Sequence, residues 1–240
     1  MTTTSDGAID AVIFDWGGTL SEHAIVEMED MWRLAARHLA PENPDEMTAK
    51  LIAVEEAHWA RCATDQRAGT LAELLAEAAA GVGADVAEAV LEEAVVRYLD
   101  AWTPHIVHDP EAAAALGALR ERGLRIGLLS NTHWPRTFHE HFLERDGLAE
   151  LIDARLYTSE MQYMKPHPDA FRKALDALRV DDPSRAVFVG DRPFDDIYGA
   201  QQAGMRAVLR PNSNVPAHDV TPDAEITNLS ELAALVDGWS

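Results

Sequence analysis

Residues 11–20 read AVIFDWGGTL, and this segment sets the frame for the rest of the chain. Its apolar first part, Ala11–Phe14, contains β-branched residues and is typical of a strand that is buried on both faces. The run stops at Asp15, and the pair Gly17 and Gly18 that follows is a strong breaker of regular structure. The segment therefore predicts a buried strand with an aspartate directly at its end.

Hydrophobic periodicity changes after this strand. From about Ser21 to Trp102 apolar residues recur at helical spacing without a strand pattern, so we expect four or five helices that form a separate module. Beyond it strands and helices alternate, which predicts an α/β fold with a doubly wound parallel sheet and helices on both faces. The expected later strands are 125–129, 154–157, 186–189, 206–209 and 225–226, and the expected helices are 109–122, 168–178, 195–203 and 229–236.

The composition is that of a globular protein with a strong acidic excess. Of the 240 residues, 47% are hydrophobic and 25% are charged, which excludes a mainly disordered protein. A formal net charge of −21 would repel a phosphate backbone and gains nothing at an anionic membrane surface. We therefore expect no nucleic-acid or membrane partner, and an anionic substrate would need a local cation.

Cysteine usage and the N-terminal segment favour a cytoplasmic location. Cys62 is the single cysteine, so no intrachain disulfide can form, and its helical context favours packing over reactivity. Residues 1–7 carry neither the basic nor the apolar part of a signal peptide. No apolar run approaches the roughly 20 residues that a membrane span needs.

Polar side chains stand at the ends of several predicted strands. Asp15 ends the first strand and Ser130 the second. Asp191 ends the fourth, and Lys165 lies between the third strand and the next helix. In an open parallel sheet, ligands bind at the carboxyl ends of the strands. The sequence therefore predicts a site at this edge that combines these four side chains.

The residue types at this edge indicate phosphoryl chemistry with a metal ion. Asp15, Asp191 and Asp196 would repel one another, and a hard divalent cation with oxygen ligands relieves that repulsion. Such a ligand set suits Mg²⁺, which can also neutralise a phosphate oxygen. One oxygen of Asp15 then remains to attack phosphorus, while Ser130 can bind a phosphoryl oxygen and Lys165 can balance charge.

Four short motifs in this order resemble those of the haloacid dehalogenase-like hydrolase superfamily. They are FDWGGTL at 14–20, LSNT at 129–132, Lys165-Pro166, and VGD at 189–191 with Asp196. The resemblance covers nearly the whole chain and implies a Rossmann-like core with a helical cap inserted after the first motif. It assigns residues 1–20 and 105–240 to the core and residues 21–104 to the cap.

The resemblance also implies hydrolysis of a small phosphorylated molecule and a role for each motif residue in that reaction. Asp15 would be the nucleophile, and Ser130 and Lys165 would bind the phosphoryl group. Mg²⁺ would be held by Asp15, the main-chain carbonyl of Gly17, Asp191 and Asp196. Asp195 is an alternative to Asp196 as the last metal ligand, and the spacing from Asp191 in the family motif favours Asp196. The candidate substrate contacts are Trp16, Gly18, Thr19, Asn131 and Thr132.

Gly17 departs from the family pattern. Phosphatases of this superfamily carry a second aspartate there, which protonates the leaving group and then activates water, and such help is typically worth about 10²–10⁴-fold. A phosphatase with Gly17 could take its acid and base from the helical stretch instead. The candidates there are His23, Glu27, Glu55, Glu56 and His58.

Other interpretations of Gly17 stay open. The phosphonate-cleaving branch begins with a similar Asp-Trp pair and uses a cap lysine as a Schiff base, and Lys50 is the only lysine in 21–104, although an exposed helix position is its favoured interpretation. Alternatively, catalysis is weak or lost and the fold serves as a binding or regulatory module. The 2-haloacid dehalogenases are less favoured because they use no metal, whereas the metal motif is intact here.

Overall fold

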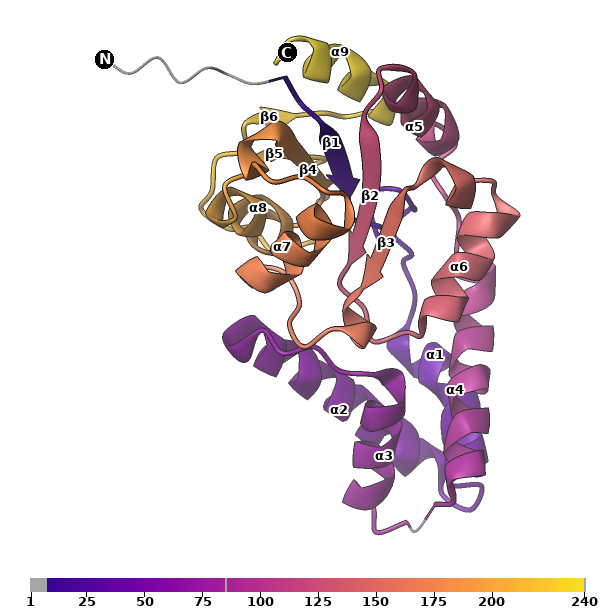
Figure 1. Cartoon of the computed structure of the whole chain (residues 1–240). Coiled ribbons are helices and arrows are strands. Elements are labelled where there is room, and N and C mark those ends of the chain that lie inside the picture. Colours follow the sequence, from indigo (N-terminus) through magenta and orange to yellow (C-terminus); the bar gives the residue numbers. More distant parts are fainter. Residues whose placement is uncertain (1–7, 85, 240) are drawn as a thin grey trace.

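The chain folds around a parallel sheet. A computed structural model describes residues 8–84 and 86–239, and it contains a six-stranded sheet in the order β3-β2-β1-β4-β5-β6 (Figure 1). The strands are β1 Ala11–Phe14, β2 Arg125–Ser130, β3 Ala154–Tyr157, β4 Ala186–Gly190, β5 Arg206–Leu209 and β6 Ala224–Glu225. All pairings within the sheet are parallel, which confirms the predicted Rossmann-like α/β class.

Helices cover both faces of the sheet. They are α5 Ala112–Glu121, α6 Arg136–Arg145, α7 Pro168–Ala177, α8 Gly199–Gln202 and α9 Leu232–Asp237. Val12 and Phe14 of β1 point into an apolar cluster that is shared with α5, α6 and α9. Ala11 and Ile13 point the other way, into a cluster that is shared with α7 and α8. The continuous apolar run of β1 thus reflects a strand that is buried on both faces.

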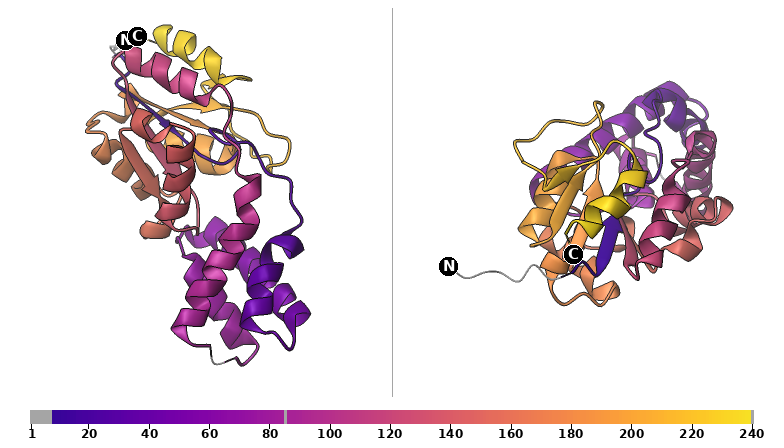
Figure 2. Two further views of the ribbon diagram at one scale, coloured as in Figure 1. Left: turned by 90° about the vertical axis from the view of Figure 1, so that its right-hand side faces the viewer. Right: turned by 90° about the horizontal axis from the view of Figure 1, so that it is seen from above.

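The stretch between β1 and α5 folds into a four-helix bundle next to the carboxyl ends of the strands (Figures 1 and 2). Its helices are α1 Met28–Leu39, α2 Pro44–Asp65, α3 Leu71–Gly81 and α4 Glu88–Trp102. They enclose an apolar cluster of their own, in which Trp32 and Tyr98 stack with ring centroids 3.9 Å apart. No helix among the described residues has both the length and the apolar character that a membrane crossing requires.

Two segments connect the bundle to the sheet, and they run side by side. Ser21 on the outgoing segment forms a bridge with His108 on the returning one. His108 Nε2 accepts a hydrogen bond from the Trp16 indole (3.0 Å), and its Nδ1 lies 2.6 Å from Asp146 Oδ2. Burial lowers the pKa of His108 while Asp146 opposes the shift, which favours a neutral ring that donates from Nδ1. The residue after Asp15 is thereby tied to both connecting segments.

The structure differs from the predicted elements in a few places. The helix expected from residue 109 begins at Ala112, because Asp109 caps a preceding turn by accepting from Glu111 N (2.8 Å). The helix expected over 195–203 consists of a π-helix, Pro193–Tyr198, and the short α8. The sequence pattern does not indicate α6, whose sequence RTFHEHFLER is largely polar. Residues 1–7, on which the expectation of no signal peptide rests, lie outside the described residues.

Candidate active site

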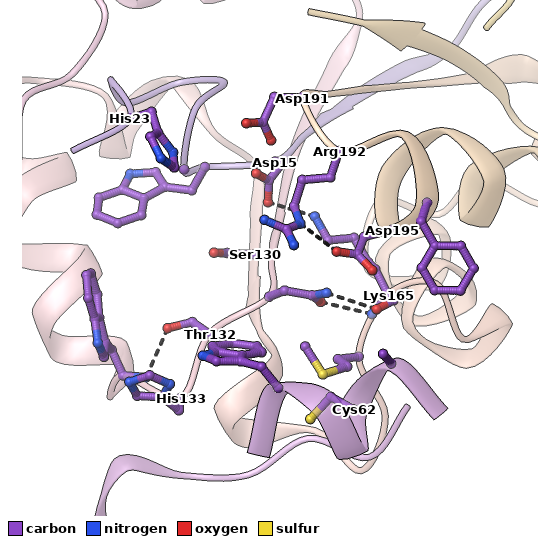
Figure 3. A pocket seen from close by; sticks show the side chains of 18 of the residues that line it. Asp15, His23, Cys62, Ser130, Thr132, His133, Lys165, Asp191, Arg192 and Asp195 are labelled. Atoms are coloured by element: carbon purple, nitrogen blue, oxygen red, sulfur yellow. Dashed lines mark hydrogen bonds and ion pairs between the residues drawn. The ribbon is translucent and has the colours of Figure 1, made fainter. Parts of the chain in front are cut away.

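The site lies where the strand order reverses. β1 and β4 are neighbours at this switch point, where open α/β sheets bind their ligands. The N–H of Asp15 donates to the carbonyl of Val189 in β4 (2.9 Å), so Asp15 and Asp191 leave the sheet close to each other (Figure 3). Gly18 has a φ of +76°, and a Cβ there would lie 2.1 Å from Asp191 Oδ2. Glycine is therefore required for the turn to pass the carboxylate.

Lys165 connects two of the carboxylates. Its Nζ donates to Asp15 Oδ1 and to Asp196 Oδ1, both at 2.7 Å, and its side chain is fully buried. Asn131 holds the backbone of this lysine: its amide donates to the Lys165 carbonyl and its Oδ1 accepts from the Lys165 N–H, both at 2.9 Å. Both polar atoms of the Asn131 side chain are thus engaged in placing the lysine.

Burial and mutual repulsion oppose the ionised form of these carboxyls. Burial raises the pKa of Asp15 to about 6, with Lys165 opposing the shift and the charge of Asp196 adding to it. Burial likewise raises the pKa of Asp191 to about 7, and the charges of Asp15 and Asp196 act in the same direction. Burial alone would lower the pKa of Lys165, but the two carboxylates outweigh it and raise that pKa. The cluster is therefore short of positive charge.

The cluster fits a metal ion by donor type and by position. Asp15, Asp191 and Asp196 each offer a carboxylate oxygen, and these oxygens lie within 4.8 Å of one another. Asp191 Oδ1 is buried and has no hydrogen-bond partner in the described part of the chain. An oxygen-only set with an unpaired carboxylate oxygen suits a hard cation such as Mg²⁺. The rival Asp195 instead pairs with Arg192, whose Nε lies 2.6 Å from Asp195 Oδ2.

Asp15, Lys165 and Asp191 line one end of a cavity of about 910 Å³, whereas Asp196 is fully buried behind them and is not among the described lining residues (Figure 3). The sequence-predicted residues that also line it are Trp16, Gly17, Ser130, Asn131 and Thr132. Gly18 and Thr19, predicted as substrate contacts, are not among the described lining residues. They form the turn behind Asp15, in which Thr19 is fully buried and its carbonyl accepts from Arg210 Nη1 (2.6 Å). The structure therefore does not bring these two residues to the cavity.

Gly17 faces open space. A Cβ at this position would meet no atom within 4 Å, so the structure has room for the absent aspartate but no substitute in the same place. The acid–base candidates that line the cavity are His23, Glu55 and Glu56. Glu27 is not among the described lining residues, and His58 lines a second cavity of about 300 Å³.

Lys50 lies away from this cavity. Its Cε is the atom nearest to a Cβ built on Gly81, at the end of α3. Among the described residues that line the cavity, the one lysine is Lys165, which the two carboxylates already engage. The structure therefore gives no support to the phosphonate interpretation, which requires the amine of Lys50 in the site.

Sequence reasoning missed two polar residues beside the cluster. Asn212, in the tract 211–222 that follows β5, donates from Nδ2 to Asp191 Oδ2 (2.7 Å). The guanidinium of Arg192 lines the cavity, and so do Pro216, Ala217 and His218 of the same tract. A signal existed for both polar residues: Arg192 directly follows the predicted Asp191, and Asn212 comes shortly after a predicted strand that ends at the same edge.

Comparison with known proteins agrees with this geometry. The family model described as "haloacid dehalogenase-like hydrolase" matches residues 9–204. The chain is 32% identical over 209 residues to a phosphoglycolate phosphatase of Rhodospirillum rubrum, covering 83% of this chain and 78% of the relative. The chain therefore belongs to the haloacid dehalogenase-like hydrolases.

Two further similarities lie within this family. A phosphoserine phosphatase of Thermus thermophilus is 38% identical over 128 residues, which cover 51% of this chain and 49% of the relative. The chain thus spans about half the length of several curated relatives that it matches. A crystal structure of a 2-haloacid dehalogenase from Pseudomonas syringae superposes with a TM-score of 0.71 at 28% identity, covering 97% of this chain and all of that one.

Proposed function

We propose that the protein hydrolyses the phosphate ester of a small molecule in a magnesium-dependent reaction through Asp15. The observation that carries the proposal is the cluster of three buried carboxylates at the switch point, two of them joined by Lys165. The similarity to two phosphatases supports the same type of reaction. In this proposal residues 1–20 and 105–240 form the catalytic core, and residues 21–104 form the cap.

Asp15 acts as the nucleophile. Its Oδ1 accepts from Lys165, which fixes the orientation of the carboxylate. A carboxylate oxygen attacks phosphorus, the bond from phosphorus to the ester oxygen breaks, and the released alkoxide takes up a proton. Water then attacks the aspartyl-phosphate at phosphorus, which releases phosphate and restores the carboxylate. Ser130 and Lys165 stabilise the charge on the phosphoryl oxygens in both steps.

The acidic residues around the nucleophile hold the cation. Asp191, Asp196, one oxygen of Asp15 and the carbonyl of Gly17 would bind Mg²⁺, which supplies charge neutralisation at a phosphoryl oxygen. Burial raises the pKa of Asp15 to about 6 although Lys165 opposes the shift, so this lysine helps to keep the nucleophile ionised at neutral pH.

The proton of the leaving group needs a source other than residue 17. His23 lies on the segment that follows the turn after Asp15, it is exposed, and it lines the cavity. Figure 3 draws its imidazole on the same side of the cavity as Asp15 and Asp191. Histidine is the side chain that most readily exchanges protons near neutral pH. We therefore assign the proton transfers to His23.

Turnover of p-nitrophenyl phosphate with and without EDTA tests the proposal. Asp15→Asn should lower Mg²⁺-dependent turnover by about 10³-fold or more, because the amide is not a nucleophile of comparable strength. Asp10→Asn is a matched control, since Asp10 lies on the same segment and pairs with Arg185 at the surface (2.7 Å). Unchanged Mg²⁺-dependent turnover in Asp15→Asn would refute the assignment of the nucleophile.

The structural similarity to a 2-haloacid dehalogenase supports a second candidate reaction. Dehalogenation would use the carboxylate of Asp15 to displace halide from carbon, but it gives no role to the buried, unpaired Asp191 Oδ1. Release of chloride from 2-chloropropionate in the presence of EDTA distinguishes the two reactions. We expect no such release.

A further inference from the structure

The cavity has a second end that differs from the carboxylate cluster. In Figure 3, Asp15 and Asp191 lie toward the top, while His133 and Cys62 lie at the bottom beside a helix of the bundle. Aromatic rings from three parts of the chain line the cavity there: Trp59 from α2, Tyr98 and Trp102 from α4, and His133 and Trp134 after β2. We call these five residues together with Glu55 the aromatic end.

Glu55 is the buried carboxylate at this end of the cavity. It is 8% exposed and lines the cavity, and its Oε2 accepts from Trp32 Nε1 (2.8 Å). Its Oε1 lies 3.4 Å from the Tyr98 hydroxyl, which donates to it. No lysine or arginine in 8–84 or 86–239 forms an ion pair with this carboxylate. Burial raises the pKa of Glu55, and the hydrogen bonds from Trp32 and Tyr98 oppose that shift.

His133 stands next to this carboxylate. Its Nε2 lies 3.6 Å from Glu55 Oε1, and neither ring nitrogen has a hydrogen-bond partner within the described ranges. The residue is 4% exposed, and burial lowers its pKa to about 3, so the imidazole is neutral. A neutral imidazole presents one ring nitrogen as an acceptor. Among the described residues, a carboxylate without a counter-charge therefore lies beside an imidazole without a hydrogen-bond partner, and aromatic rings surround both.

The geometry points to a binding site for a protonated amine at the aromatic end, formed by Glu55, His133 and the surrounding rings. An ammonium group can donate to Glu55 Oε1 and to a nitrogen of His133, and it supplies the counter-charge that the carboxylate lacks. The rings of Trp59 and Tyr98 lie close by, with centroids 5.5 Å and 6.1 Å from that of His133, and aromatic rings attract cations in a desolvated site. A net charge of −21 also favours a cationic group over an anionic one.

The proposed amine site implies a substrate class for the phosphatase reaction, and this part of the inference rests on the proposed function. A molecule with its phosphate at Asp15 and its amine at Glu55 is the phosphate monoester of an amino alcohol. The two charged groups would occupy opposite ends of the same cavity, so the length of the linking chain determines the fit.

A series of ω-aminoalkyl phosphates tests the inference against n-alkyl phosphates in which a methyl group replaces the ammonium. At the best chain length, we expect kcat/KM for the amine to exceed that of its alkyl counterpart by about tenfold or more. Glu55→Gln keeps the shape of the side chain and should reduce this ratio to about one. Glu92→Gln, the same change on an exposed position of α4, should leave the ratio as in the wild type.

Two further measurements keep the inference open to refutation. His133→Phe keeps a ring at this position but removes the acceptor nitrogen, so it should also lower the amine-to-alkyl ratio of kcat/KM. This variant tests the inference if Glu55→Gln does not fold. Calorimetric titration with the free amino alcohol of best length should detect binding to the wild type and a loss of about tenfold in Glu55→Gln.

The outcomes separate this inference from the proposed function. Absence of p-nitrophenyl phosphate turnover, together with amine binding that depends on Glu55, would remove the phosphatase assignment and leave the amine site. Turnover of p-nitrophenyl phosphate with an amine-to-alkyl ratio of one or less at every chain length would overturn the amine site. A high ratio that persists in both variants would overturn it as well.

Discussion

The two ends of the cavity contain the same kind of group in different electrostatic settings. At the sheet end, Asp15 and Asp196 share Lys165, whose Nζ is 2.7 Å from an oxygen of each. At the aromatic end, Glu55 has no lysine or arginine partner among the described residues, and the neighbouring His133 is neutral. A buried carboxylate needs a counter-charge to remain ionised. The sheet end has part of this counter-charge in Lys165, whereas the aromatic end, in our proposal, receives it from the substrate.

The buried carboxyls and the buried histidines around the cavity respond to acid in opposite directions. Burial raises the pKa of Asp15 to about 6 and that of Asp191 to about 7, so the folded protein binds these protons before the unfolded chain does. As the pH falls, proton binding to these two groups therefore stabilises the folded protein. Burial lowers the pKa of His133 and of His139 to about 3, so the unfolded chain binds these protons first. Below about pH 6.5, stability is lost through the histidines.

The largest expected effect comes from removing the cation of the sheet end. Lys165→Met leaves Asp15 and Asp196 buried without their shared partner, which should lower the free energy of unfolding by about 3–5 kcal/mol. Turnover of p-nitrophenyl phosphate should fall by about 10³-fold, because the nucleophile loses its orientation and its ionisation. Urea unfolding at pH 7 and steady-state kinetics measure the two effects.

Lys173→Met is the control for this change. Lys173 is exposed on α7, so the same substitution there should alter neither stability nor turnover appreciably. If Lys165→Met were as stable and as active as the wild type, the contrast between a sheet end with its own lysine and an aromatic end without one among the described residues would be lost.

A smaller effect is expected from a histidine that adjoins the cavity. His139 is fully buried, its Nε2 lies 3.1 Å from Thr132 Oγ1, and its ring stacks on Tyr157. The folded protein keeps this ring neutral, whereas the unfolded chain protonates it below about pH 6.5. Lowering the pH from 7 to 5 should therefore reduce the free energy of unfolding by about 2 kcal/mol through His139, at about 1.4 kcal/mol per pH unit below 6.5. His139→Phe should therefore lose about 2 kcal/mol less than the wild type over this interval.

Urea unfolding at both pH values measures that difference, with His141→Phe on the exposed side of α6 as the control. Comparison with the wild type cancels the opposite contributions of Asp15 and Asp191. An equal loss of stability in the wild type and in His139→Phe would show that this ring takes up its proton in the folded state.

The smallest effect is expected from adding a carboxyl group at residue 17, beside the sheet end. Gly17→Asp places a carboxyl where a Cβ meets no atom within 4 Å, and we expect turnover of an alkyl phosphate to rise about tenfold. Gly17→Asn, which has the same size but no acid, should show no gain. In a His23→Gln background the gain from Gly17→Asp should be larger, because the proposed proton donor is absent. A folded, Mg²⁺-binding Gly17→Asp variant without a gain would show that proton transfer does not limit the reaction.

The sheet end could be predicted residue by residue because parallel strands impose its geometry. Asp15 and Asp191 follow strands that pair in register, Ala11 with Ala186 through Phe14 with Val189. A polar residue at the end of either strand must therefore reach the same edge. The same reasoning extends to Asn212 beyond β5, which we did not single out. It cannot indicate that Asn131 uses its side chain on the Lys165 backbone, since that depends on the path of a loop.

The aromatic end could not be predicted in this way. Glu55 and Trp59 are four residues apart, which places them on the same face of a helix. The sequence does not indicate which part of the chain packs against that face. His133 follows a strand end, yet its position beside Glu55 depends on how the bundle lies against the sheet. The same dependence places Lys50 next to Gly81 rather than in the cavity.

The sequence by itself therefore determined the fold class, the family and the edge of the sheet at which the acidic cluster forms, because strand ends and glycine turns are local features with a fixed geometry. Only the tertiary structure decided which carboxylates share a lysine, which polar groups stay unpaired and what shares the cavity with Gly17. Those outcomes depend on contacts between segments that lie far apart in the chain, and electrostatic interactions between buried groups follow distance in space rather than separation in sequence.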